Sequence, residues 1–228
     1  MFAFILLFVG TMAISLIAGA RVKSQFRRWS GVHATSGLTG AEAASKILRQ
    51  AGIHNVEVVP YEGMLSDHYD PVNRRLALSE GVYSSRSVAA LGIAAHEAGH
   101  ALQHAQAYAP LAWRMGAVKI TTFASGAMMF LPIVFSLLGQ VTLGLTIMVI
   151  GLSIMMLFNL VTLPVEFDAS RRAKALLLRS GMISPGEEQR GVNNVLDAAG
   201  LTYVAAFVSS LAYLLYYLVP LLTGRSEE

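Results

Sequence analysis

Four apolar runs without a single charged side chain dominate this sequence. Each is about 20 residues long, which lets a helix cross a hydrocarbon core of about 30 Å. They are Phe2 to Ala20, Ile120 to Leu138, Val141 to Leu163 and Leu201 to Leu222. Buried helices of one globular core are the alternative, but several uncharged runs of this length are atypical of such a core. We therefore expect a mainly α-helical integral membrane protein with four transmembrane helices.

The runs divide the chain into alternating membrane and polar parts. We expect a transmembrane anchor at 1–20, a small cytoplasmic α+β domain at 21–119, a transmembrane hairpin at 120–163, cytoplasmic helices at 164–200, a transmembrane helix at 201–222 and a tail at 223–228.

Charged residues are scarce and cluster beside the apolar runs. Only 14% of the 228 residues are charged, against about a quarter in a typical soluble domain. The net charge is +3, but many of the 17 Lys and Arg side chains flank apolar runs, which indicates contact with a lipid bilayer rather than with nucleic acid. The absence of cysteine excludes disulfides, iron–sulfur clusters, Cys-ligated zinc and a thiol nucleophile. A metal ion would have to be held mainly by His, Asp or Glu.

The positions of Lys and Arg predict one orientation in the cell membrane. Basic residues follow the first run and flank both feet of the hairpin, whereas the hairpin tip Gly139-Gln140 is uncharged. They are Arg21, Lys23, Arg27 and Arg28, then Arg114 and Lys119, then Arg171, Arg172 and Lys174. The N-terminus is therefore expected outside, with both long polar segments in the cytoplasm. A cleaved signal peptide is the alternative for the first run, because Ala18-Gly19-Ala20 fits a cleavage site, although no basic residue precedes the run.

The first polar segment carries helix and strand signals. Thr39-Gly40-Ala41-Glu42 is a capping box, which predicts a helix from Thr39 to Ala51 that stops at Gly52. Turn residues and apolar alternation then predict a strand at 56–60, a loop at 63–71 and a short strand at 74–79 that Gly81 breaks. Ser84 or Ser87 is expected to cap a further helix that runs towards Ala107.

The second polar segment is expected to hold two helices. One covers Glu166 to Arg179, separated from the membrane run by Pro164. The other has Ser184 as its N-cap, Glu187 closing a capping box and Gly200 as its stop.

His96-Glu97-Ala98-Gly99-His100 is the pattern with the clearest chemistry. On a helix, His96 and His100 share one face and can converge on a tetrahedral zinc ion. Glu97 then projects to where it can act as general base for a metal-activated water. A chance match on a solvated helix face is the alternative, but the neighbouring residues are small and apolar, and the chain has only six His. An unpaired ionisable triplet would be costly to bury there.

A zinc peptidase needs a third protein ligand, and the sequence offers three candidates. His104 lies two turns beyond His96, about 12 Å along a straight helix, which is too far for one ion. His68 lies in a loop that could fold anywhere. Glu166 stands at the cytoplasmic foot of the hairpin, and a hairpin brings its two feet together. We therefore favour a site of two His and Glu166, a ligand set that accepts zinc and also other divalent metals.

These motifs together resemble the YugP-like family of membrane-bound neutral zinc metallopeptidases. The matching segments are Leu38 to Glu42, Leu65 to Pro71, Ala95 to His104 and Glu166 to Ser170. More distantly, the chain is similar to the HtpX-like and CAAX prenyl-protease gluzincins, in which a membrane hairpin also separates HExxH from a Glu ligand. The resemblance implies a zincin-like domain with zinc on His96, His100 and Glu166 and with Glu97 as catalytic base. The distant relatives carry an Asp four residues after the ligand Glu, where this chain has Ser170; its nearest acid is Asp168.

The predicted function is that of a membrane-embedded zinc endopeptidase that cleaves peptides or proteins, including membrane proteins, in quality control or processing. His68, Tyr69 and Tyr83 are candidates for holding substrate or the oxyanion, and the strand around Leu76 to Ser79 for pairing with an extended peptide. Asp168 and His104 are further candidates for orienting residues of the site. One alternative is a non-catalytic membrane protein that binds zinc for structure or regulation. Another is a transporter, which the few polar residues of the third run support only weakly.

Overall fold

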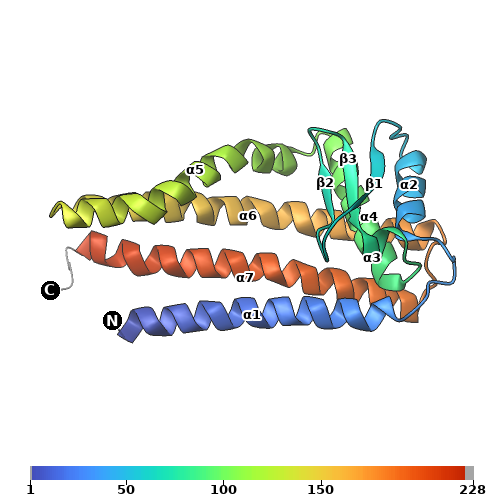
Figure 1. Cartoon of the computed structure of the whole chain (residues 1–228), viewed down its shortest axis with the longest axis horizontal. Coiled ribbons are helices and arrows are strands. Elements are labelled where there is room, and N and C mark those ends of the chain that lie inside the picture. The colour runs from blue at the N-terminus through green and yellow to red at the C-terminus, as the bar shows by residue number, and fades with distance from the viewer. Residues whose placement is uncertain (1, 224–228) are drawn as a thin grey trace. The chain divides into compact units, whose positions relative to one another are not determined.

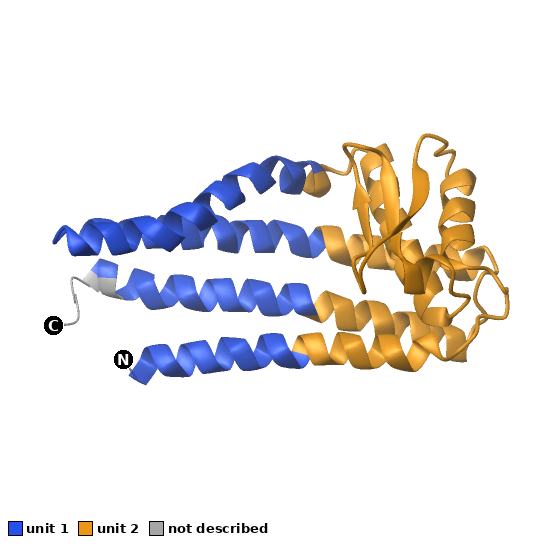
Figure 2. Ribbon diagram, viewed as in Figure 1, with its two compact units in different colours: residues 1–17, 112–164, 202–228 blue, residues 18–111, 165–201 orange. Residues whose placement is uncertain are grey.

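The computed structural model describes residues 2–223, so residues 224–228 of the predicted tail lie outside the described part. Helices dominate the chain (Figure 1): α1 Phe2–Ser30, α2 Gly40–Gln50, α3 Glu80–Tyr83, α4 Val88–Ala105, α5 Ala109–Leu137, α6 Val141–Arg179 and α7 Glu187–Thr223. The strands are β1 Glu57–Tyr61, β2 His68–Asp70 and β3 Arg75–Ser79. Two compact units divide the chain (Figure 2), one of residues 1–17, 112–164 and 202–228 and the other of residues 18–111 and 165–201.

Four helices are long and apolar enough to cross a membrane: α1, α5, α6 and residues Glu187–Val219 of α7. The prediction of a mainly helical chain with four long apolar helices is therefore confirmed. In the first unit, large apolar side chains stay exposed, for example Phe123 at 79% and Leu137 at 84%. A surface of this kind needs an apolar environment such as lipid to cover it. Asn159 finds its partner within this unit, where its Nδ2 donates to Ser210 Oγ at 3.1 Å.

The second unit contains a mixed three-stranded sheet in the order β1-β3-β2. β3 pairs in parallel with β1 along its whole length and antiparallel with β2 over Arg75 to Ala77. The prediction that Leu76 to Ser79 offers a free edge is therefore wrong, because β3 is the central strand. The predicted loop at 63–71 also contains β2, a strand of only three residues that is defined by its pairing with β3.

Most predicted helix caps are present. Thr39 and Glu42 form the capping box of α2, with Thr39 N donating to Glu42 Oε2 at 2.8 Å and Glu42 N to Thr39 Oγ1 at 3.2 Å. Ser87, not Ser84, caps α4 by accepting a hydrogen bond from Ala90 N at 3.2 Å. The predicted cap at Ser184 is wrong, because α7 begins only at Glu187; Ser184 N instead donates to Glu188 Oε2 at 2.8 Å from the turn before the helix.

Two predicted helix boundaries do not exist. α6 continues through Pro164, and α7 continues through Gly200. An interior proline costs a helix about 3 kcal/mol, which the burial of the next turn, including Val165 and Ala169 at 0% exposure, can offset. Gly200 serves close packing rather than helix termination, because a Cβ there would lie 3.1 Å from the Phe167 ring.

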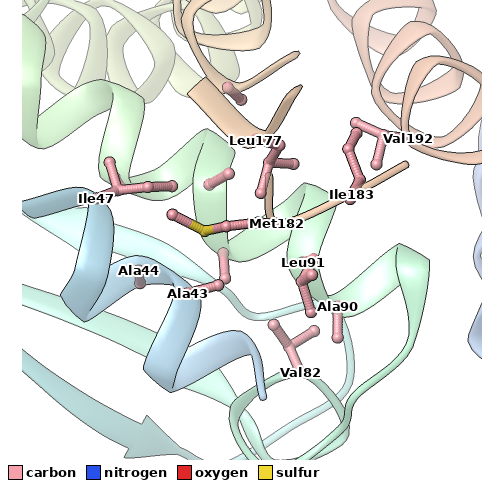
Figure 3. Packing of buried hydrophobic residues seen from close by; sticks show 14 of the residues in the cluster. Ala43, Ala44, Ile47, Val82, Ala90, Leu91, Leu177, Met182, Ile183 and Val192 are labelled. Atoms are coloured by element: carbon pink, nitrogen blue, oxygen red, sulfur yellow. The ribbon is translucent and has the colours of Figure 1, made fainter. Parts of the chain in front are cut away.

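The apolar core of the second unit surrounds α4. Side chains from α2, α4, α6 and α7 meet there, and Figure 3 shows Met182 between Leu177 and residues of α2 such as Ile47. α4 contributes mainly small residues, with Ala90, Ala94 and Ala98 all at 0% exposure. Because alanine side chains are short, the neighbouring helices pack close to the α4 backbone, and this closeness positions the residues described next.

Candidate metal centre

α4 and α6 bring three residues of the predicted site together. His96 and His100 lie one turn apart on α4, with ring centroids 4.7 Å apart. From α6, Oε2 of Glu166 approaches Nε2 of His96 to 3.2 Å and Nε2 of His100 to 3.6 Å. The candidate ligand atoms of all three residues lie within 4.8 Å of one another. Glu166 is 2% exposed, so this carboxylate is buried beside two imidazoles.

Gly99 permits this approach of the two helices. A Cβ on Gly99 would lie 2.8 Å from the carbonyl oxygen of Ala169 and 3.2 Å from its Cα. Both atoms belong to the α6 backbone, which cannot move aside as a flexible side chain could. The glycine inside the HExxH motif is therefore the residue that lets the turn carrying Glu166 come close to α4.

The second ring nitrogen of each His has its own partner. Nδ1 of His96 lies 3.1 Å from Ser170 Oγ, and Nδ1 of His100 lies 3.0 Å from Gln103 Oε1. Both Nε2 atoms consequently face Glu166. Ser170, at the position where the distant relatives carry Asp, contacts a candidate ligand directly. Gln103 was missed by the sequence reasoning, although its spacing of three residues from His100 on one helix was a usable signal.

Glu97 is buried without a side-chain partner in the part of the chain that the structure describes. It lies next to His96 on α4 and is 8% exposed. Its carboxylate forms no hydrogen bond with any described residue. The carboxylate is nevertheless not fully sealed from solvent. A nearly buried carboxylate that water still reaches suits a general base and has no evident packing role.

The site favours positive charge. Burial alone would lower the pKa of His100, but its hydrogen bond to Glu166 and the charges of Glu97 and Glu166 outweigh that effect and raise the pKa above its ordinary value. Two imidazole nitrogens and one carboxylate oxygen at this spacing also form a donor set that zinc accepts. The residues present therefore fit a divalent metal ion.

The other two candidates for third ligand lie elsewhere. His104 pairs with a residue of β2, its Nδ1 lying 2.9 Å from the hydroxyl of Tyr69. His68 is exposed, with its Nδ1 2.8 Å from the backbone carbonyl of Ser66. Among the described residues, neither His joins the group of three potential ligands.

The remaining predicted residues have identifiable positions. Asp168 accepts a hydrogen bond from Gln103 Nε2 at 3.0 Å and pairs with Arg171 and Arg172. It therefore reaches His100 through Gln103 rather than directly. Tyr83 lies half-buried in α3 and lines a cavity together with Tyr61 and Ser79. The proposed substrate and oxyanion roles of Tyr83, Tyr69 and His68 stay predictions.

Comparison with known proteins identifies relatives over the whole chain. The sequence model of a family described as "Putative neutral zinc metallopeptidase" matches residues 4–222. The "Putative membrane protease YugP" of Bacillus subtilis (strain 168) is 46% identical over 226 residues, which cover 99% of each chain. No solved structure matches the chain. The resemblance inferred from the motifs is confirmed, and the chain belongs to the family described as "Putative neutral zinc metallopeptidase".

Proposed function

We propose that this chain is an integral-membrane zinc endopeptidase in which His96, His100 and Glu166 bind the metal and Glu97 is the general base. The observation that carries the proposal is the meeting of two Nε2 atoms and a buried carboxylate oxygen within 4.8 Å. Glu166 on α6 lies 70 positions after His96 on α4 in the chain. Such a cluster in a chain of this family fits a two-His, one-Glu catalytic site.

Each residue has a defined chemical task in this proposal. Zinc bound here would supply a Lewis acid for the scissile carbonyl and a water with a pKa of about 7. Glu97, which has no hydrogen-bond partner among the described residues, takes a proton from the attacking water and later delivers it to the nitrogen of the leaving amine. Glu166, His96 and His100 would supply three ligand atoms, one of them negatively charged. A fourth ligand position would therefore stay available for water or substrate.

The second unit is proposed to be a small zincin-like peptidase domain. Its support is the order of elements, in which the mixed sheet precedes the helix that carries the HExxH motif. β2 is an edge strand, and its outer side is not paired with any strand among residues 2–223. An extended substrate can add to such an edge through backbone hydrogen bonds, so we propose β2 as the pairing strand in place of β3.

We further propose that the protein lies in the cell membrane with its N-terminus outside and its site on the cytoplasmic side. The support is the placement of Lys and Arg after the first run and at both feet of the hairpin. Substrates on that side would be peptides or proteins, including membrane proteins that await processing or removal.

The test of the function is the substitution Glu97→Gln in detergent-purified protein. Glutamine keeps the size of the side chain but cannot accept the proton, so we expect zinc content to stay at the wild-type level while peptide hydrolysis is lost. Hydrolysis at the wild-type rate by this variant would contradict Glu97 as the base and with it the proposed mechanism. A wild type that binds zinc but hydrolyses no peptide would favour a non-catalytic zinc protein, since a structural zinc site needs no base.

A further inference from the structure

We propose that Gln103 is a positioning residue for His100, fixing the imidazole in the tautomer that presents an unprotonated Nε2 to the metal. The inference rests on the proposed function in one respect, namely that His100 is a metal ligand. Gln103 itself would not touch the ion. Its side chain is completely buried and makes three hydrogen bonds, to His100, to the backbone of Val165 and to Asp168.

The first step concerns the orientation of the Gln103 amide. Its Nε2 lies 2.8 Å from the carbonyl oxygen of Val165 and 3.0 Å from Oδ2 of Asp168. A backbone carbonyl can only accept, and Asp168 is paired with two arginines that favour its ionised, acceptor-only form. The amide nitrogen must therefore face Val165 and Asp168, because the opposite orientation would set an oxygen against two acceptors.

The second step concerns the ring of His100. With the amide so oriented, Oε1 of Gln103 is the atom 3.0 Å from His100 Nδ1. An amide oxygen only accepts, so Nδ1 must carry the hydrogen. A neutral imidazole has one N–H, which leaves the lone pair on Nε2, the atom 3.6 Å from Glu166. Without this acceptor the ring could carry its hydrogen on Nε2, where it would block the ligand atom.

His96 lacks a comparable constraint. Its Nδ1 partner is the hydroxyl of Ser170, which can donate or accept a hydrogen bond and so accommodates either tautomer. Of these two partners, Gln103 is thus the one that selects a single tautomer, because its amide oxygen can only accept a hydrogen bond. Asp168 acts one step further away, by holding the Gln103 amide in place.

The chain offers a control in Gln106, which is exposed where Gln103 is buried. It is the same residue type one turn further on, and its Oε1 accepts from Arg172, which also pairs with Asp168. Gln106 forms no hydrogen bond with either His of the site among the described residues. Gln106→Met therefore reports the effect of disturbing the Arg172–Asp168 pair without touching either His.

The experiment measures zinc affinity by chelator competition on the detergent-purified full chain. Gln103→Met keeps most of the side-chain volume but removes the acceptor, and we expect the zinc dissociation constant to rise roughly 10–100-fold, as is typical when a partner of a metal-bound His is lost. Gln106→Met should leave the constant unchanged. Gln103→Glu keeps an oxygen beside Nδ1 and, as the protonated acid, an O–H donor towards Val165 and Asp168, so it should bind zinc more tightly than Gln103→Met.

The second readout is the ¹⁵N NMR spectrum of histidine-labelled, metal-free protein above the titration range of the rings, with His100→Ala to assign the signal. We expect the Nδ1–H tautomer of His100 in the wild type and in Gln103→Glu, and a mixture in Gln103→Met. Wild-type zinc affinity in Gln103→Met would overturn the inference. Equal losses of zinc affinity in Gln103→Met and Gln103→Glu, with the tautomer of His100 unchanged in both, would also overturn it. If the wild type binds no zinc, the proposed function fails, while the tautomer measurement still decides the role of Gln103.

Discussion

Nε2 of His96 lies 3.2 Å from Oε2 of Glu166, although 70 positions separate the two residues in the chain. The contact joins α4, the helix of the HExxH motif, to α6, which contains the second arm of the predicted hairpin and continues beyond it. Because the carboxylate is 2% exposed, a positive charge beside it, such as a protonated imidazole or a metal ion, stabilises its ionised form. The close packing of α6 against α4 places this carboxylate beside the imidazoles. A change in the packing should therefore also change the electrostatics of the site.

The substitution Gly99→Ala should separate the two helices. Its new Cβ would lie 2.8 Å from the Ala169 carbonyl oxygen, so α6 must shift, and overpacking of this kind typically costs about 1–3 kcal/mol. We expect a lower melting temperature and weaker zinc binding in detergent-purified protein. Gly92→Ala on the same helix is the control, because its Cβ would meet Val192 at an ordinary 3.6 Å. Equal behaviour of the two variants would contradict the role assigned to Gly99.

The stabilisation by zinc should increase with pH. The pKa of His100 is raised in the metal-free fold, so its protonated form stabilises that fold below the pKa of the unfolded chain, about 6.5. This contribution is lost as pH rises through the folded-state pKa, whereas zinc requires the deprotonated ring. Melting temperatures with and without zinc between pH 5 and 9 should therefore diverge towards high pH. A zinc-induced shift that is largest at acid pH would count against His100 as a ligand.

The orientation in the membrane can be tested with single-cysteine variants, because the chain has no native cysteine. Gln140→Cys at the hairpin tip and Arg49→Cys at the end of α2 both replace exposed residues. We expect a membrane-impermeant thiol reagent to label Gln140→Cys in intact cells and Arg49→Cys only after permeabilisation. Labelling in the reverse order would place the proposed site outside the cell.

His104 should be dispensable for metal binding. It is engaged by the Tyr69 hydroxyl at 2.9 Å and stands apart from the three proposed ligands. His104→Ala and Tyr69→Phe should each keep the zinc content of the wild type and lose about 0.5–1.5 kcal/mol of stability, the usual worth of one hydrogen bond. Loss of zinc in His104→Ala, measured by metal analysis after gel filtration, would show that α4 supplies three ligands.

Local signals in the sequence predicted much of the fold. Thr39 and Glu42 form their capping box, Ser87 caps α4, and each apolar run lies within one long helix apart from Leu138, which directly follows α5. These features depend on neighbouring residues. Pro164 and Gly200 were misread as helix boundaries because packing of α6 and α7 overrides local preference. Strand β2 exists only through its pairing with β3, so its three residues gave no pattern of their own.

The candidate site was predictable to a similar degree. The convergence of Glu166 with His96 and His100 followed from a topological argument, because a hairpin returns the chain to its starting side. Gln103 was not foreseen, since its importance depends on Val165 and Asp168, which lie 62 and 65 positions away. Contacts of that range become visible only when α4 and α6 are seen packed together.

The most direct measurement is the zinc stoichiometry of detergent-purified protein for the wild type, Glu166→Ala and His68→Ala. We predict one zinc per chain in the wild type and in His68→Ala, and loss of zinc in Glu166→Ala, because Glu166 supplies the carboxylate between the two imidazoles. Retention of zinc in Glu166→Ala together with its loss in His68→Ala would move the third ligand to β2 and contradict the proposed site.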